Sequence, residues 1–158
     1  MKQNIREVDI NEYMPLLISL LDKGITMPLV ITGNSMTPFL VHMRDIVYIS
    51  KPKNVLKKGD IVFFKRMNGD FVIHRIWNIN KKNQLFIIGD GQLIIEGPIE
   101  SNQILGVVKK VNRKNRMLTE KNWIWRFFSI FWIRIIKYRP IFVRIISALK
   151  LDKKQNKS

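Results

Sequence analysis

Short apolar runs with turn-forming residues between them limit this chain to a mainly β fold. The runs are rich in Val, Ile and Phe, and the segments that separate them, KKGD, MNGD and NKKNQ, have the composition of turns. Asn68-Gly69 lies between two such runs, which is a good signal for a short hairpin. We expect strands at residues 28–32, 45–50, 60–66, 70–79, 84–88 and 103–111.

Helical patterns precede and follow the strand region. Apolar residues recur at helical spacing over residues 9–23, and Gly24 ends that pattern. Residues 122–138 are expected to form a helix that Pro140 ends or kinks. The chain is thereby divided into a short N-terminal helical segment (1–27), a strand domain (28–118) and a basic, aromatic, amphipathic C-terminal region (119–158).

Positive charge is concentrated in the C-terminal region. The chain carries 28 Lys and Arg against 12 Asp and Glu, and residues 121–158 contain ten of the basic residues with a single acid, Asp152. Such an excess favours an anionic partner, either nucleic acid or an anionic membrane surface.

The aromatic residues of this region distinguish among its possible roles. They occur in apolar runs such as FFSIFWI, with Arg126, Arg134 and Lys137 on one arc of the expected helix. This pattern favours a helix lying in the plane of a membrane, with Trp and Phe at the acyl boundary and basic residues at the headgroups. A helix packed on the strand domain, and nonspecific binding to nucleic acid, remain as alternatives.

Several classes of protein are made improbable by what the sequence lacks. The absence of cysteine excludes a disulfide framework, thiolate catalysis and Cys-ligated zinc. The first residues do not resemble a signal peptide, because the apolar run 14–21 is short and acidic residues precede it. No uncharged apolar run reaches the roughly 18 residues of a spanning helix.

Four polar residues in the strand region suggest nucleophilic catalysis. Ser35 follows the first expected strand, and His74 lies within the apolar strand FVIHRIWNI. Asp90 follows the strand LFIIG, and Glu96 comes six residues later. A hydroxyl needs a base to take its proton, a neutral imidazole suits that task near pH 7, and a carboxylate can orient the imidazole. Composition alone does not show that these groups meet.

The order of the motifs carries a resemblance to a known superfamily. The successive segments GNSMTPFL, LKKGDIVFFKR, FVIHRI, IIGDG and NQILGVV resemble the motifs of the signal peptidase and repressor-type protease superfamily, serine peptidases of the S24/S26 kind. The resemblance covers about residues 28–111 and implies the β fold of that superfamily. His74-Arg75 stands where many members have a lysine base, so the chain looks like the His-using branch of endoplasmic-reticulum and archaeal signal peptidases.

The resemblance implies a role for each candidate residue. Ser35 would be the nucleophile and His74 the general base, with Asp90, Glu96 or both orienting the imidazole. Gly33, Asn34, Met36 and Pro38 would form the substrate-binding and oxyanion segment. Since some relatives donate a hydroxyl to the oxyanion from the position of Gly33, the oxyanion here would depend on backbone N–H groups, chiefly that of Ser35. Met36 is equally consistent with core packing and with the floor of a substrate cleft.

These observations predict a serine endopeptidase that makes limited cleavages in extended peptides, such as signal or leader segments, without a metal or organic cofactor. Its expected partners are a peptide or preprotein substrate, an anionic membrane surface and an exporter, with no specific nucleic acid. It is expected to associate peripherally with the membrane at the bacterial cytoplasmic face. The alternatives are a catalytically degenerate module that binds peptide or membrane, and a basic nucleic-acid-binding protein.

Overall fold

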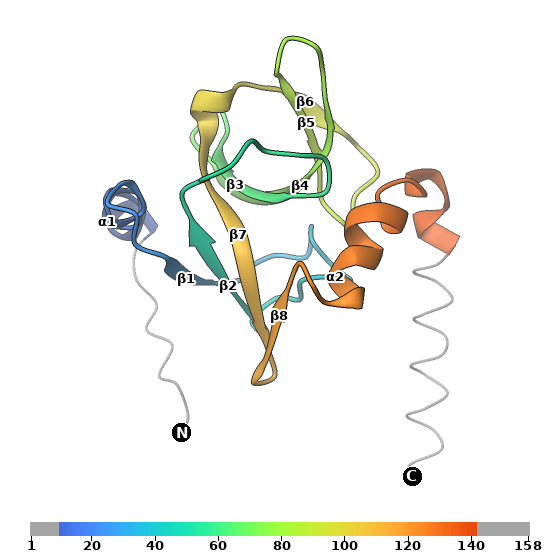
Figure 1. The fold of residues 1–158 in the computed structure, drawn as a ribbon, viewed down its shortest axis with the longest axis horizontal. Coiled ribbons are helices and arrows are strands. Elements are labelled where there is room, and N and C mark those ends of the chain that lie inside the picture. Colours follow the sequence, from blue (N-terminus) through green and yellow to red (C-terminus); the bar gives the residue numbers. More distant parts are fainter. Residues whose placement is uncertain (1–9, 142–158) are drawn as a thin grey trace.

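An antiparallel sheet of eight strands forms the centre of the computed structural model, which describes residues 10–141 (Figure 1). Helix α1 (Ile10–Asp22) precedes the sheet, and short helical turns follow it. The strands are β1 (Met27–Val30), β2 (Asp45–Ser50), β3 (Ile61–Lys65), β4 (Phe71–Ile79), β5 (Leu85–Ile88), β6 (Glu96–Ile99), β7 (Ile104–Arg113) and β8 (Arg116–Thr119). Their order is β1-β2-β7-β3-β4-β5-β6, and β8 also pairs with β7.

Strand β3 is buried on both faces because a separate apolar cluster covers each one. Ile61 and Phe63 belong to a cluster that includes α1 and β2, whereas Val62 and Phe64 belong to a cluster formed with β5 and other strands. Successive side chains of a strand point to opposite faces, so a strand between two apolar layers becomes a continuous apolar run. The run IVFF of β3 fulfils this requirement.

The sequence predicted most of these elements. Helix α1 coincides with the expected helix to within a residue at each end, and Gly24 follows it at a φ of +79°. All six expected strands are present with small differences in their ends. The expected hairpin is also confirmed: Gly69 has a φ of +97° and its N–H donates to the carbonyl oxygen of Arg66 at 3.0 Å.

Two short strands were missed. Strand β6 contains Gly97-Pro98, residues that weaken a strand, but it is the last strand in the order of the sheet, where proline is tolerated. Strand β8 follows β7 after Lys114 and Asn115, which have φ values of 49° and 62°. Two residues at positive φ form a tight hairpin turn, and Asn115 was the signal that this turn offered.

The prediction of one helix over residues 122–138 is wrong. The structure has α2 (Trp123–Phe127), a π turn η2 (Phe128–Trp132) and a 3₁₀ turn η3 (Ile136–Tyr138). The regular helix ends early because Trp132 and Ile133 are drawn into the interior, where they are 1% and 0% exposed. Trp132 belongs to the run FFSIFWI, whose aromatic residues were expected at the acyl boundary of a membrane, and for Trp132 that expectation is wrong.

Pro140 does not end a long helix. A new helical turn begins at residue 139, and proline is tolerated in the first turn of a helix. The apolar residues that follow Pro140 lie, from residue 142 on, outside the described residues. The division into three parts stays a prediction. The main apolar cluster contains residues from all three: Leu17 of α1, Val47 of β2 and Trp125 of α2.

Candidate active site

The loop that carries Ser35 begins directly after β1. Gly33 has a φ of +75°, a left-handed conformation that glycine adopts without strain. Its N–H donates to Nδ1 of His42 at 3.0 Å, so in this structure the amide is already occupied and does not serve an oxyanion. Asn34 is exposed, Ser35 is half-buried and Pro38 follows a cis peptide bond.

Two buried side chains anchor the Ser35 loop. Met36 is 3% exposed and belongs to the main apolar cluster, which favours its role in core packing over one as the floor of a cleft. The ring of Phe39 lies 5.4 Å from that of Trp125 and 5.0 Å from that of Phe128, between centroids. The guanidinium of Arg75 lies 5.0 Å from the Phe39 ring centre. The Ser35 loop is therefore fixed against both β4 and the C-terminal segment.

The Ser35 loop also packs closely on the residues that follow β5. The carbonyl oxygen of Ser35 accepts a hydrogen bond from the N–H of Gly91 at 2.8 Å. A Cβ at Gly91 would lie 2.6 Å from the carbonyl oxygen of Thr37, and a Cβ at Gly89 would collide with that of Ser35. Gly89 follows Ile88, which pairs with Arg75 across the β4–β5 ladder. The loop thus lies beside the part of β4 that carries His74 and Arg75.

The side chains of His74, in β4, and Glu96, at the start of β6, are in contact. His74 is 1% exposed, pairs with Val62 of β3, and places Nδ1 2.9 Å from Oε1 of Glu96. The contact has the length of a hydrogen bond but not its alignment, since neither ring nitrogen of His74 has a geometrically complete hydrogen bond. Catalytic contacts are often misaligned before substrate binds.

Arg66 holds Glu96 in place. Its Nε and Nη2 donate to the two carboxylate oxygens of Glu96, each at 2.7 Å. Such a bidentate pair fixes both the position and the plane of the carboxylate. Sequence analysis missed Arg66. This residue follows β3 and Glu96 begins β6, and no sequence pattern links two residues that are 30 positions apart.

Burial and charge determine the protonation states of this pair. Burial lowers the pKa of His74 below 6.5, an effect that the charge of Glu96 opposes and that of Arg66 reinforces. Burial would raise the pKa of Glu96, but the hydrogen bond from Arg66 and the nearby charges of His74 and Arg66 lower it below 4.5. At neutral pH the imidazole is accordingly uncharged and the carboxylate ionised, as a general base and its orienting group require.

Asp90 has a different partner. Both of its carboxylate oxygens accept from Arg75, from Nε at 2.9 Å and from Nη2 at 2.8 Å, and the two side chains are fully buried. Adjacent residues of a strand point to opposite faces, which separates the Arg75–Asp90 pair from the His74–Glu96 pair. Of the two candidate acids, Glu96 contacts the imidazole of His74, whereas Asp90 forms an ion pair with Arg75.

No hydrogen bond between Ser35 and His74 is found in the structure of residues 10–141. Nε2 of His74 is buried and has no hydrogen-bond partner within residues 10–141, and no hydrogen bond of the Ser35 hydroxyl is found there either. An unsatisfied buried nitrogen costs free energy. Nε2 of His74 is therefore available to accept a proton from a group that approaches it.

The C-terminal segment completes the surroundings of this site. Nη1 of Arg75 donates to Oγ of Ser129 at 3.0 Å, and Nε1 of Trp132 donates to the carbonyl oxygen of Asp90 at 2.8 Å. Nη1 of Arg139 donates to the carbonyl oxygens of Gly89 and Gln92 at 2.9 and 2.8 Å. Sequence analysis missed these contacts, because the acceptors of Trp132 and Arg139 are backbone oxygens, which residue type does not reveal.

No cluster of His, Asp and Glu that could hold a metal ion occurs among residues 10–141. Comparison with known families gives one match: a family model described as Peptidase S24-like matches residues 2–109. None of the curated protein sequences compared with this chain matches it. The family match ends before residues 121–139, which supply Ser129, Trp132 and Arg139 to the surroundings of the site.

Proposed function

The chain belongs to the Peptidase S24-like family, and we propose that it is a serine endopeptidase that makes limited cleavages in extended peptides. Membership of the family suggests a serine peptidase. The observation that carries the proposal for this chain is the 2.9 Å contact between Nδ1 of His74 and Oε1 of Glu96, within a buried environment that keeps the imidazole neutral.

The proposed reaction uses Ser35, His74 and Glu96 in turn. Oγ of Ser35 attacks the peptide carbonyl carbon while Nε2 of His74 takes the hydroxyl proton, and Glu96 stabilises the imidazolium through Nδ1–H. The carbonyl oxygen becomes an oxyanion, for which the N–H of Ser35 is the candidate donor. Collapse expels the amine, which receives the proton from His74, and a water molecule then hydrolyses the acyl-enzyme by the same route.

The fold supports an extended substrate. β1 is terminal in the strand order, so among the described residues one of its edges is unpaired, and it leads directly into the Ser35 loop. A peptide added as a strand beside β1 would run toward the nucleophile. We propose signal or leader segments processed near a membrane as the substrates, with an exporter as a further partner.

A peptide library tests the activity. The purified full-length protein is incubated with peptides from a digested proteome, and mass spectrometry identifies new termini. We expect new termini with the parent and with Ser19→Ala, a change at an exposed serine of α1, and none with Ser35→Ala or His74→Ala. New termini that persist in Ser35→Ala would refute the assignment of the nucleophile.

A catalytically degenerate, peptide-binding module is the second candidate. It is favoured by the absence of a hydrogen bond between Ser35 and the buried Nε2 of His74. Such a module would bind extended peptides equally well before and after Ser35→Ala, and would generate no new termini with either form.

A further inference from the structure

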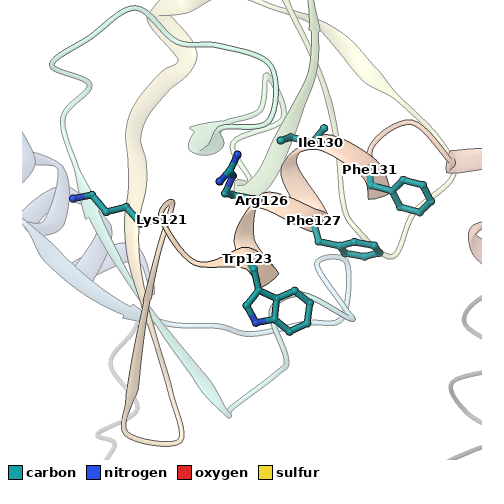
Figure 2. A pocket seen from close by; sticks show the side chains of 6 residues that line it. All are labelled: Lys121, Trp123, Arg126, Phe127, Ile130 and Phe131. Carbon is teal, nitrogen blue, oxygen red and sulfur yellow. The ribbon is translucent and has the colours of Figure 1, made fainter.

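Large apolar side chains project from one face of the C-terminal segment. Trp123 is 76% exposed, Ile130 and Phe131 are each 47% exposed, and Phe127 is 39% exposed. They line a surface groove of about 420 Å³ together with Lys121 and Arg126 (Figure 2). Monomeric soluble proteins rarely leave such large apolar groups together in water, so a cluster of this kind marks an interaction site.

The C-terminal segment cannot rotate to bury these exposed apolar side chains in the protein. Its inner face is already fixed in the interior by Trp125, Trp132 and Ile133, which are 5%, 1% and 0% exposed. Hydrogen bonds from Trp132 and Arg139 tie the same face to the loop after β5. The outer face therefore keeps its orientation whether or not a partner covers it.

Charge around the groove identifies the kind of partner. Residues 121–141 contain no Asp or Glu, and four of their basic side chains are exposed: Lys121, Arg126, Arg134 and Lys137. Aromatic rings beside Lys and Arg, without acids, suit the boundary between acyl chains and anionic headgroups. No helix among residues 10–141 is long and apolar enough to cross a membrane.

We propose that the outer face of residues 121–137 docks on an anionic lipid bilayer. Trp123, Phe127, Ile130 and Phe131 enter the acyl boundary, and the four exposed basic residues contact the headgroups. Since the inner face of the segment contacts Arg75 and the loop after β5, docking would hold the candidate active site at a fixed place relative to the membrane. The proposal stands without the proposed peptidase activity, because it concerns binding alone.

Sedimentation with lipid vesicles tests the docking surface. The full-length protein is mixed with vesicles of phosphatidylcholine alone or of phosphatidylcholine with phosphatidylglycerol. We expect strong binding to the anionic vesicles only, weakened but not abolished by salt, because screening leaves the apolar part intact. Trp123→Ser should weaken binding by at least about tenfold, and Arg126→Gln by about fivefold.

Matched variants lie elsewhere on the surface. Met67→Ser removes an apolar side chain that is 92% exposed in the β3–β4 hairpin, and Lys82→Gln removes an exposed charge in the β4–β5 turn. Both should bind as the parent does. Equal losses in Met67→Ser and Trp123→Ser, or no binding by the parent, would overturn the proposal. So would a protein dimer in solution that Phe131→Ser dissociates, since a second copy would then occupy the face.

Discussion

Burial, and after it the charges of Glu96, Arg66 and Asp90, set the pKa of His74 and with it the pH at which the imidazole can act as a base. Burial and Arg66 lower its pKa, while Glu96 raises it. The acidic limb of kcat/KM should therefore lie below pH 6.5, because this limb reports protonation of the base in the free enzyme.

Arg66→Gln should move that limb to higher pH. The substitution removes a positive charge that lowers the pKa of His74, so the imidazole takes up a proton more readily. Arg66→Lys keeps the charge and should restore most of the original profile, and Arg116→Gln, at an exposed arginine, should not move it. A profile measured on a cleaved peptide decides the matter: an unchanged limb in Arg66→Gln would contradict the electrostatic account.

Substitutions of the two candidate acids, Glu96 and Asp90, should have different effects on catalysis and stability. Glu96→Gln removes the carboxylate beside the imidazole and should lower kcat by about 10²–10⁴-fold, with a smaller loss of stability than at Asp90 because Glu96 and its partner Arg66 are partly exposed. Asp90→Asn leaves the buried Arg75 without its counterion, which should cost about 3–5 kcal/mol of unfolding free energy. Urea denaturation and single-turnover kinetics on both variants separate the effects; a stable, slow Asp90→Asn and an unstable, active Glu96→Gln would reverse the assignment.

At the scale of single residues, the sequence pointed to the candidate reactive groups but not to the residues that hold them in place. Ser35, His74 and Glu96 stand out because hydroxyl, imidazole and carboxylate are conspicuous in apolar surroundings and follow a known order of motifs. Which of Asp90 and Glu96 contacts the imidazole could be decided only from the structure. The answer depends on whether the acid lies on the face of β4 that carries His74 or on the face that carries Arg75.

Among the elements, the C-terminal segment differs most from expectation, because one long helix was expected and several short turns packed on the sheet are found. Arg139, which is 2% exposed, donates to the carbonyl oxygens of Gly89 and Gln92. Arg139→Gln should lower the unfolding free energy by about 3 kcal/mol, because it leaves buried carbonyl groups without donors. Arg134→Gln, at an exposed arginine five residues earlier, should change stability by about 0.5 kcal/mol or less.

Urea denaturation of the two variants measures this difference. Deletion of residues 121–158 should unfold the strand domain for the same reason, and thereby remove any peptidase activity. A truncated chain that remains folded and cooperative would show that the contacts of Ser129, Trp132 and Arg139 are dispensable.

The predictable elements are those whose own residues determine them. Strand β3 is apolar throughout and α1 has helical periodicity, so tertiary contacts only reinforce the local pattern. Strand β6 forms against the propensity of Gly97-Pro98 because β5 offers a free edge. The helix over 122–138 fails because burying Trp132 and bonding it to Asp90 outweighs regular helical geometry.

For the whole molecule, the lowered pKa values of His74 and Glu96 make folding depend on pH with a definite sign. Each group is protonated more readily in the unfolded chain, so its contribution is complete above the unfolded pKa and is lost as pH falls through the folded one. The unfolding free energy should decrease as pH falls below 6.5, and again below 4.5. His74→Gln should lack the first decrease; an identical decrease in that variant would assign it to other groups.

The central claim is that Ser35 forms an acyl-enzyme with the help of His74. The direct measurement is the intact mass of the protein, acid-quenched during cleavage of a peptide found in the library, followed by mapping of the modified segment. The account predicts an added mass equal to the acyl fragment, located on Ser35, and its absence in Ser35→Ala and His74→Ala. Cleavage by Ser35→Ala, or an adduct on another residue, would contradict it.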